Sequence, residues 1–374
     1  MLRTRSSSCC ENLPMEFEER KKYLGSAKLN IIEAMQKIDQ NNRGILYIVG
    51  ESAKLLGSLT DGDIRRWIIR TGKLDGCVEQ VMFAKTKYLT ENERERAGEF
   101  MLAENLSSVP ILDADRRITD ILFLDESGRA DERESGTALF GIPVVIMAGG
   151  KGTRLYPFTK ILPKPLIPIG DIPIIERIIE RFCAYGADLF YLTVNYKKEM
   201  IKSYFSELAP AYGLRYVEEE LPLGTAGSLR LIEEEFKVPV IISNCDTLIE
   251  ADYEKVLAYH RESHNALTIV AALKNTTIPY GVIHSKEQGL VASMEEKPCM
   301  SYFINTGMYV ICPEYIKRIP KGRVYHMTDL AEALIADGCK VGMYPISENS
   351  FWDMGEFKEM KKMEDRINHG FVRG

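Results

Sequence analysis

The sequence has 374 residues, 45% hydrophobic and 27% charged, so it is long enough for two domains with full-sized cores. Its net charge of −6 argues against a partner made of nucleic acid. It contains no apolar run of about 18 residues to cross a membrane and no apolar stretch after residues 1–14 to form a signal peptide. We therefore expect a cytoplasmic protein, and its eight cysteines, which form no CxxC pair, are expected to be reduced thiols.

A pattern of strand, polar turn and strand occurs twice between Gly25 and Asp125, at an offset of about 63 residues. The first copy contains "GILYIVGESAKLLGSLTDGDIRRWII" and the second "SSVPILDADRRITDILFLDE", and each follows an amphipathic helical stretch. One copy alone is too small to bury much apolar surface. The two copies are therefore expected to pack as one α+β module.

This module resembles a CBS-domain pair, and "GSLTDGDIRR" is close to that family's most recognisable motif. The resemblance implies that Thr60 and Asp63 hold the ribose and phosphate of an adenine nucleotide. The alternative is that both residues simply cap the helix that follows, since Thr and Asp are favoured there. In the second copy Phe123 stands where Thr60 would align, so at most one half-site is intact.

A polar, charged segment with flanking glycines, "ESGRADERESG", separates the repeat from the rest of the chain and is typical of a linker. Downstream, buried-type strands such as "PVVIMA" and "VPVIISN" alternate with helical stretches, which predicts a Rossmann-like α/β domain with a mixed, mostly parallel sheet. The expected organisation is an N-terminal tail, a CBS-domain pair, a linker and an α/β domain, at residues 1–20, 21–127, 128–141 and 142–374.

The first strand of the α/β domain runs into a glycine loop, "VVIMAGGKGTRLYPFT". In a parallel sheet such loops lie at the ligand-binding edge, and glycines let backbone N–H groups approach an anion. The loop is neither a Walker A motif nor a GxGxxG fingerprint. Taken alone, it could equally be a tight turn.

The longer stretch "GGKGTRLYPFTKILPKPLIPIG" resembles the signature of the sugar-phosphate nucleotidyltransferases, GGxGTRLxPxT followed by PKP. The resemblance covers roughly residues 143–374. Further motifs follow in the order typical of that family: "LPLGTAGSL", "NCD", "PYG", "EEKP", "NTG" and "FWDMG".

Members of this family join a sugar 1-phosphate to the α-phosphorus of a nucleoside triphosphate and release pyrophosphate. A phosphate monoester is already ionised at neutral pH, so the attacking oxygen needs no general base. Two polyanions must be brought together, so fixed cations are required. The resemblance implies that Arg154 grips the β and γ phosphates, that Lys164 lies on the α-phosphate, and that Lys297 holds the sugar phosphate.

Two aspartates are the expected metal ligands. Asp246 directly follows the strand "VPVIISN", and Asp353 comes from "FWDMG", far along the chain. Two carboxylates with phosphate oxygens and water suit Mg²⁺. A turn or helix-capping role is the alternative for Asp246 taken alone.

The remaining motif positions imply contacts to the two substrates. For the nucleotide these are Ala148, Gly149, Gly150, Gly152, Thr153, Glu219, Glu220, Gly224 and Thr225. For the sugar phosphate they are Tyr280, Gly281, Glu296, Lys297 and Asn305.

In this family a residue five positions before the Gly-Thr step reads the base, which is Glu219 or Glu220 here, depending on the count. A carboxylate only accepts hydrogen bonds, and guanine offers adjacent donors, which favours GTP. A solvated acidic run is the alternative.

The chain most resembles CBS-tethered guanylyltransferases that make GDP-glucosamine for legionaminic acid synthesis, which implies glucosamine 1-phosphate as substrate. We also expect a homo-oligomer. Mannose 1-phosphate or another sugar 1-phosphate is the alternative substrate. A non-catalytic nucleotide sensor is the rival to an enzyme. A CBS module that acts chiefly as a dimerisation clamp is a further possibility and is compatible with catalysis. The presence of Arg154, Lys164, Asp246, Lys297 and Asp353 favours the enzyme.

Two features are expected to be structural. His260 and His264 lack the Glu of a zinc HExxH motif and are expected to be exposed on a helix. The helical stripe of Ile174, Ile175, Ile178, Ile179 and Phe182 is expected to be core packing.

Overall fold

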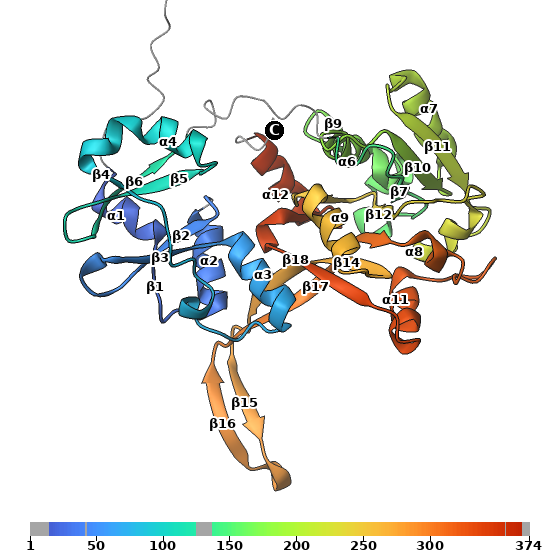
Figure 1. The fold of residues 1–374 in the computed structure, drawn as a ribbon. Helices are drawn as coiled ribbons and strands as arrows, with labels where there is room; N and C mark the ends of the chain where they lie inside the picture. The colour runs from blue at the N-terminus through green and yellow to red at the C-terminus, as the bar shows by residue number, and fades with distance from the viewer. Residues whose placement is uncertain (1–14, 42, 125–136, 356, 369–374) are drawn as a thin grey trace, which may run out of the picture. The chain divides into compact units, whose positions relative to one another are not determined.

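The computed structural model describes residues 15–41, 43–124, 137–355 and 357–368. The chain divides into two compact units, Met1–Glu134 and Ser135–Gly374, which are described separately (Figure 1). The predicted tail is described only from residue 15, and the predicted linker only from residue 137, so the rest of both predictions lies outside the described residues. No helix in the described parts of the chain is long and apolar enough to cross a membrane.

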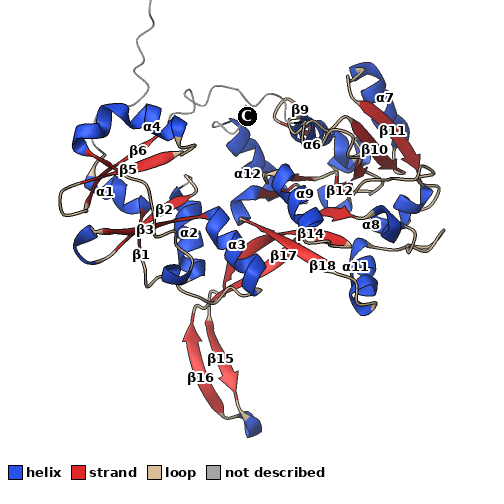
Figure 2. Cartoon of the chain, in the orientation of Figure 1, coloured by secondary structure: helices blue, strands red, loops and turns tan. Residues whose placement is uncertain are grey.

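The N-terminal unit contains the predicted repeat as two three-stranded sheets (Figure 2). In each sheet the first strand pairs parallel to the second and the second pairs antiparallel to the third, with a register shift at the matching position. The strands are β1 (Leu24–Ser26), β2 (Ile45–Val49), β3 (Leu55–Thr60), β4 (Leu89–Thr90), β5 (Ser108–Leu112) and β6 (Ile118–Phe123). The helices are α1 (Phe17–Arg20), α2 (Ile31–Asn41), α3 (Asp61–Thr71) and α4 (Ala97–Ala103).

The two copies of the repeat share buried side chains, as expected of halves that are too small to fold alone. One core cluster combines Tyr23, Tyr47 and Leu55 with Leu112, Ile118 and Ile121. The hydroxyl of Tyr47 lies 2.8 Å from Oγ of Ser108 in the other copy. Burial raises the pKa of Tyr47, so this phenol stays neutral.

The second unit is built on a seven-stranded sheet in the order β11-β10-β7-β12-β17-β14-β18. Only β17 runs against the others, so the predicted α/β fold with a mixed, mostly parallel sheet is confirmed. The strands are β7 (Val144–Met147), β10 (Leu189–Val194), β11 (Gly213–Glu218), β12 (Val240–Asn244), β14 (Leu267–Thr277), β17 (Cys299–Ile311) and β18 (Val341–Ile346).

Both faces of the sheet are covered, because alternate residues of a strand point to opposite faces. Val144 and Ile146 of β7 belong to one core cluster, and Val145 and Met147 to the other. The first cluster includes residues of α6 (Ile174–Cys183), α7 (Lys198–Leu208), α9 (Tyr253–Glu262) and α12 (Phe357–Asn368). The second includes residues of α10 (Pro313–Ile316) and α11 (Met327–Ala336). The isoleucine stripe of α6 is fully buried, which confirms its predicted packing role.

Two small strand pairs complete this unit. The antiparallel pair β13 (Thr247–Ile249) and β19 (Phe351–Asp353) joins segments that are far apart in sequence. The hairpin of β15 (Gly281–Ser285) and β16 (Val291–Glu296) extends away from the large sheet (Figure 1). Its strands are almost entirely exposed.

The prediction of exposed helix histidines is wrong for His260, whose side chain is only 1% exposed. His260 lies on the inner side of α9, with Nδ1 at 2.9 Å from Oγ1 of Thr268 and Nε2 at 3.4 Å from Sγ of Cys312. His264 is exposed, as predicted, but it lies in the turn beyond the last residue of α9 and not on the helix.

We expect His260 to make the protein sensitive to acid. Burial lowers the pKa of His260 from 6.5 to about 4. As the pH falls, this histidine therefore binds a proton at a higher pH in the unfolded chain than in the folded chain. The contribution of His260 to the free energy of unfolding is therefore fully present above pH 6.5. It is lost as the pH drops toward 4, by about 3 kcal/mol in total. Urea unfolding at several pH values checks this: His260→Gln should remove much of the decline and His264→Gln none of it. An equal decline in all three proteins would contradict the assignment.

Candidate active site

The glycine loop follows β7 at the carboxyl edge of the sheet, where predicted. Gly152 has a positive φ of 62°, and a Cβ there would lie 2.9 Å from Cγ2 of Thr159 and 3.0 Å from Cβ of Lys164. A side chain at Gly152 would therefore strain the backbone and press on both neighbours. Around Gly150, by contrast, no heavy atom comes within 4 Å of a Cβ position. This part of the loop leaves room for a ligand close to the backbone.

Lys164 lies behind this loop, at the start of the 3-10 turn Lys164–Leu166. Its side chain is 8% exposed, and its ammonium group forms an ion pair with the carboxylate of Asp246, whose side chain is 18% exposed. Asp246 comes two residues after β12, so it also lies at the carboxyl edge. A buried ammonium is stable only beside a partner, and Asp246 supplies one.

Asp353 is brought to Asp246 by the pairing of β13 with β19. Thr247 lies opposite Asp353 in this pair, and the N–H of Met354 donates to the carbonyl of Asp246 at 2.9 Å. Burial raises the pKa of Asp353, and the nearby charge of Asp246 raises it further. Lys164 and Arg154 act in the opposite direction. Two carboxylates and two cations therefore form one electrostatic cluster.

Arg154 reaches this cluster from the glycine loop. Its Nη1 atom lies 3.2 Å from the position that a Cβ on Gly355 would occupy, and Oδ2 of Asp353 lies 2.9 Å from the same position. A larger residue at 355 would thus displace the guanidinium or the carboxylate. Gly355 is a functional residue that was not predicted, and its place in "FWDMG" is the only sequence signal that points to it.

Two carboxylates fit Mg²⁺, which usually takes one or two protein carboxylates and completes its shell with water and phosphate oxygens. The described part of the chain has no group of three or more His, Cys, Asp or Glu side chains arranged to hold a metal alone. Asp246 and Asp353 are therefore suited to a metal that arrives with a phosphate ligand.

The structure distinguishes the two glutamates that sequence could not separate. Glu219 is 7% exposed, and its Oε2 accepts from the N–H of Leu223 at 2.9 Å. Its Oε1 lies 2.7 Å from a Cβ position on Gly149, so this carboxylate faces the glycine loop. Burial raises the pKa of Glu219, while Leu223 and Thr193 stabilise the ionised form. Glu220 is exposed.

The predicted sugar-phosphate residues are more open. Tyr280 is 74% exposed, and Gly281, Glu296 and Lys297 lie on or beside the hairpin. Lys297 Nζ is 3.9 Å from a carboxylate oxygen of Glu296. Asn305 lies on β17, where its amide donates to the hydroxyl of Tyr309 at 2.6 Å. Among the described residues, no recorded hydrogen bond or ion pair joins this group to Lys164 or Asp246.

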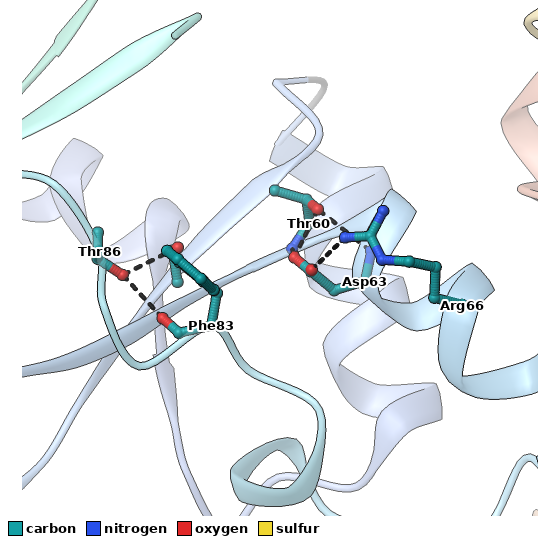
Figure 3. A network of polar contacts seen from close by, with 6 residues as sticks. Thr60, Asp63, Arg66, Phe83 and Thr86 are labelled. Carbon is teal, nitrogen blue, oxygen red and sulfur yellow. Dashed lines mark hydrogen bonds and ion pairs between the residues drawn. The ribbon is translucent and has the colours of Figure 1, made fainter. Parts of the chain in front are cut away.

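In the N-terminal unit, Thr60 and Asp63 form a capping box at the start of α3 (Figure 3). The N–H of Asp63 donates to Oγ1 of Thr60 at 3.2 Å, and the N–H of Thr60 donates to Oδ2 of Asp63 at 2.9 Å. Arg66 donates to the other carboxylate oxygen of Asp63 at 2.5 Å. The capping role considered from sequence is therefore present. The cap uses Oδ2 of Asp63 and Arg66 uses Oδ1, so both carboxylate oxygens are occupied.

Comparison with known proteins agrees with the motifs. Residues 143–369 match the Nucleotidyl transferase family. A mannose-1-phosphate guanylyltransferase of Mycobacterium tuberculosis is 33% identical over 223 residues, covering 57% of this chain and 61% of that protein. A UTP--glucose-1-phosphate uridylyltransferase of Synechocystis is 32% identical over 237 residues, covering 57% and 60%.

Among solved structures, HddC from Yersinia pseudotuberculosis is 25% identical, with a TM-score of 0.47, and covers 60% of this chain and 99% of that chain. The chain spans about 60% of the length of the two curated relatives named above. Since the family match takes in most of the chain, from the first strand of the large sheet to α12, this protein belongs to the nucleotidyl transferase family.

Proposed function

We propose that this protein transfers a nucleotidyl group from a nucleoside triphosphate, preferentially GTP, to a sugar 1-phosphate and releases pyrophosphate. The observation that carries the proposal is the cluster of Arg154, Lys164, Asp246 and Asp353 beside an open glycine loop. It lies at the edge where parallel α/β sheets bind ligands. The two curated relatives, named for a guanylyl and a uridylyl transfer to sugar 1-phosphates, support the reaction class.

The chemistry requires charge neutralisation rather than proton abstraction. An oxygen of the sugar phosphate attacks the α-phosphorus, the bond to the bridging oxygen breaks, and pyrophosphate leaves with that electron pair. The attacking phosphate has a second pKa of about 6, so it is ionised at neutral pH. Lys164 would neutralise charge that develops on the α-phosphate, and Arg154 would hold the departing phosphates.

Asp246 and Asp353 would hold Mg²⁺, which would supply positive charge at the phosphate oxygens. In the structure Lys164 already pairs with Asp246 and lowers the pKa of Asp353. Lys164 and Arg154 thus offset part of the rise in the pKa of Asp353 that burial and Asp246 cause. Lys164 would shift part of its interaction from Asp246 to the substrate phosphate on binding.

We propose Glu219 as the residue that favours guanine. Its carboxylate is held by Leu223 and faces the glycine loop, so its position is fixed before a nucleotide binds. Adjacent N–H donors on guanine match a carboxylate. Relatives of nearly equal identity are named for guanylyl and for uridylyl transfer, so overall similarity does not decide the base.

Glu219→Gln should lower the preference for GTP over UTP by about tenfold to a hundredfold, because one acceptor becomes a donor facing the donors of guanine. The exposed Glu220→Gln is the matched control and should keep the preference. The ratio of kcat/KM values for the two nucleotides measures it. Equal ratios in both variants and the wild type would remove Glu219 from base recognition.

For the sugar we propose glucosamine 1-phosphate, on the resemblance to guanylyltransferases that make GDP-glucosamine. Mannose 1-phosphate is the competing candidate, supported by the relative from M. tuberculosis. Incubation with GTP and an equimolar mixture of glucosamine, mannose, glucose and N-acetylglucosamine 1-phosphates tests the choice. Chromatography that separates the isomers GDP-mannose and GDP-glucose, followed by mass spectrometry, should find GDP-glucosamine in excess. Excess GDP-mannose would establish the competing substrate.

We also propose that the N-terminal unit is a CBS-domain pair that binds an adenine nucleotide near Thr60 and Asp63. The repeated sheets support the resemblance. Binding would require Asp63 to exchange part of its capping box for ribose hydroxyls. Calorimetry with AMP and ATP tests this. Heat of binding that is lost in Asp63→Asn is expected, and no heat with either nucleotide would end the proposal.

A further inference from the structure

The segment that carries Glu219 and the Gly-Thr step is held by a part of the chain about a hundred residues away. We call residues 219–227 the nucleotide loop and residues 323–327 the docking segment. The N–H of Tyr325 donates to the carbonyl of Leu223 at 2.8 Å. The N–H groups of Ala226 and Gly227 both donate to the carbonyl of Tyr325, at 2.9 and 3.0 Å.

The glycines of the nucleotide loop are explained by this contact. Gly224 has a φ of +78°, and a Cβ there would lie 2.7 Å from the carbonyl oxygen of Tyr325. A Cβ on Gly227 would lie 2.9 Å from the carbonyl oxygen of Arg323. These distances are too short for real side chains, so both residues must be glycine for the two backbones to approach. The docking segment by itself therefore requires glycine at both positions.

Thr225 adds the side-chain part of the contact. Its Oγ1 accepts from the N–H of Met327 at 3.0 Å, and its own N–H lies 3.5 Å from Nδ1 of His326. Met327 is the first residue of α11, and its side chain is fully buried. The first N–H groups of a helix have no partner within the helix. Thr225 therefore satisfies a helix N–H that is otherwise unpaired within α11, and in doing so fixes the nucleotide loop to a rigid element.

We infer that Thr225 is a positioning residue, which sets the nucleotide loop for base recognition through Met327 and does not itself contact the nucleotide. The inference rests on the proposed function, since it concerns how that site recognises its nucleotide. It extends that proposal by identifying the contact with the docking segment as what fixes the positions of Glu219 and Leu223. If the nucleotide loop is released from the docking segment, the protein should bind the nucleotide less tightly, and its affinity for the sugar phosphate should not change.

Thr225→Val tests this, because valine keeps the shape of threonine but cannot accept the hydrogen bond. KM for GTP should rise about tenfold, as expected for a lost hydrogen bond that leaves a donor unpaired, with kcat and KM for the sugar phosphate changed less than about threefold. Thr225→Ser restores the oxygen and should recover most of the loss. The control is Thr328→Val, the same change at an exposed position one residue beyond Met327, which should have no effect.

A second variant separates positioning from direct contact. Gly227→Ala forces the same two segments apart without changing Thr225, so it should raise KM for GTP as Thr225→Val does. If Thr225→Val and Gly227→Ala act through one contact, KM for GTP in the double variant should be little higher than in the more impaired of the two single variants. Multiplied effects would show a direct nucleotide contact and overturn the inference, as would an unchanged KM in Thr225→Val. Thermal unfolding of each variant identifies loss of fold.

Failure of the proposed function can be recognised separately. Absence of turnover in the wild type with any nucleotide and sugar phosphate would contradict the proposed function. The positioning inference would then be judged by the calorimetric Kd for GTP in the wild type, Thr225→Val and Gly227→Ala. An unchanged Kd in Thr225→Val would overturn it in that case as well.

Discussion

Replacing Lys164 by alanine should lower kcat by about a thousandfold, because in the proposed reaction it removes a preplaced cation from the point where negative charge would develop. The ammonium is almost fully buried and paired with Asp246, so no solvent cation replaces it equally well. Its loss also removes one of the two cations that lower the pKa of Asp353. That carboxylate should therefore titrate at higher pH in the variant.

The matched control is Lys160→Ala, four residues earlier. Lys160 is exposed and lies 5.7 Å from the ring centroid of Tyr156, outside the cluster. Single-turnover measurements at saturating nucleotide separate the chemical step from binding. Near-normal turnover in Lys164→Ala, or an equal loss in both variants, would contradict the role given to Lys164.

Replacing Asp246 by asparagine should lower kcat/KM by about a hundredfold or more and, if it holds the proposed metal, raise the Mg²⁺ concentration needed for half-maximal rate. The change removes one of two carboxylates suited to the metal and leaves the buried Lys164 without a charged partner. It should also lower the pKa of Asp353, since the charge of Asp246 raises it. The acidic limb of the pH–rate profile should then move to lower pH.

Asp171→Asn is the control for this change, because the Asp171 side chain is 89% exposed and forms a surface pair with Arg177. A magnesium titration of the rate in both variants is the measurement. A wild-type magnesium dependence in Asp246→Asn would remove Asp246 from metal binding.

The strands and helices that position the site could be predicted from sequence. Apolar runs such as Val144–Met147 and the stripe of α6 have the period of the element they form, and their burial follows directly from it. The repeat of the N-terminal unit could also be predicted, because the apolar alternation of its strands occurs twice in the sequence. His260 was misjudged because it was compared only with a zinc motif. It follows Leu257 by three residues and Val256 by four, which is the spacing of the buried face of α9.

The meeting of distant residues could not be derived from patterns. Asp246 and Asp353 are joined by β13 and β19, which have three residues each and carry no periodic signal. Only the resemblance to a family linked them in advance. The choice between Glu219 and Glu220 depended on burial, which an acidic run does not reveal. The docking segment had no motif at all, because its contacts are made mainly by backbone atoms.

The central claim is that this chain is a sugar-1-phosphate nucleotidyltransferase that uses GTP. Pyrophosphate release in the presence of Mg²⁺ tests it most directly, with GTP, UTP, CTP, ATP and dTTP each paired with glucosamine, mannose, glucose and N-acetylglucosamine 1-phosphates. The account predicts release that requires both substrates and is fastest with GTP and glucosamine 1-phosphate. Absence of release across every pair, with AMP or ATP also added for the N-terminal unit, would contradict it.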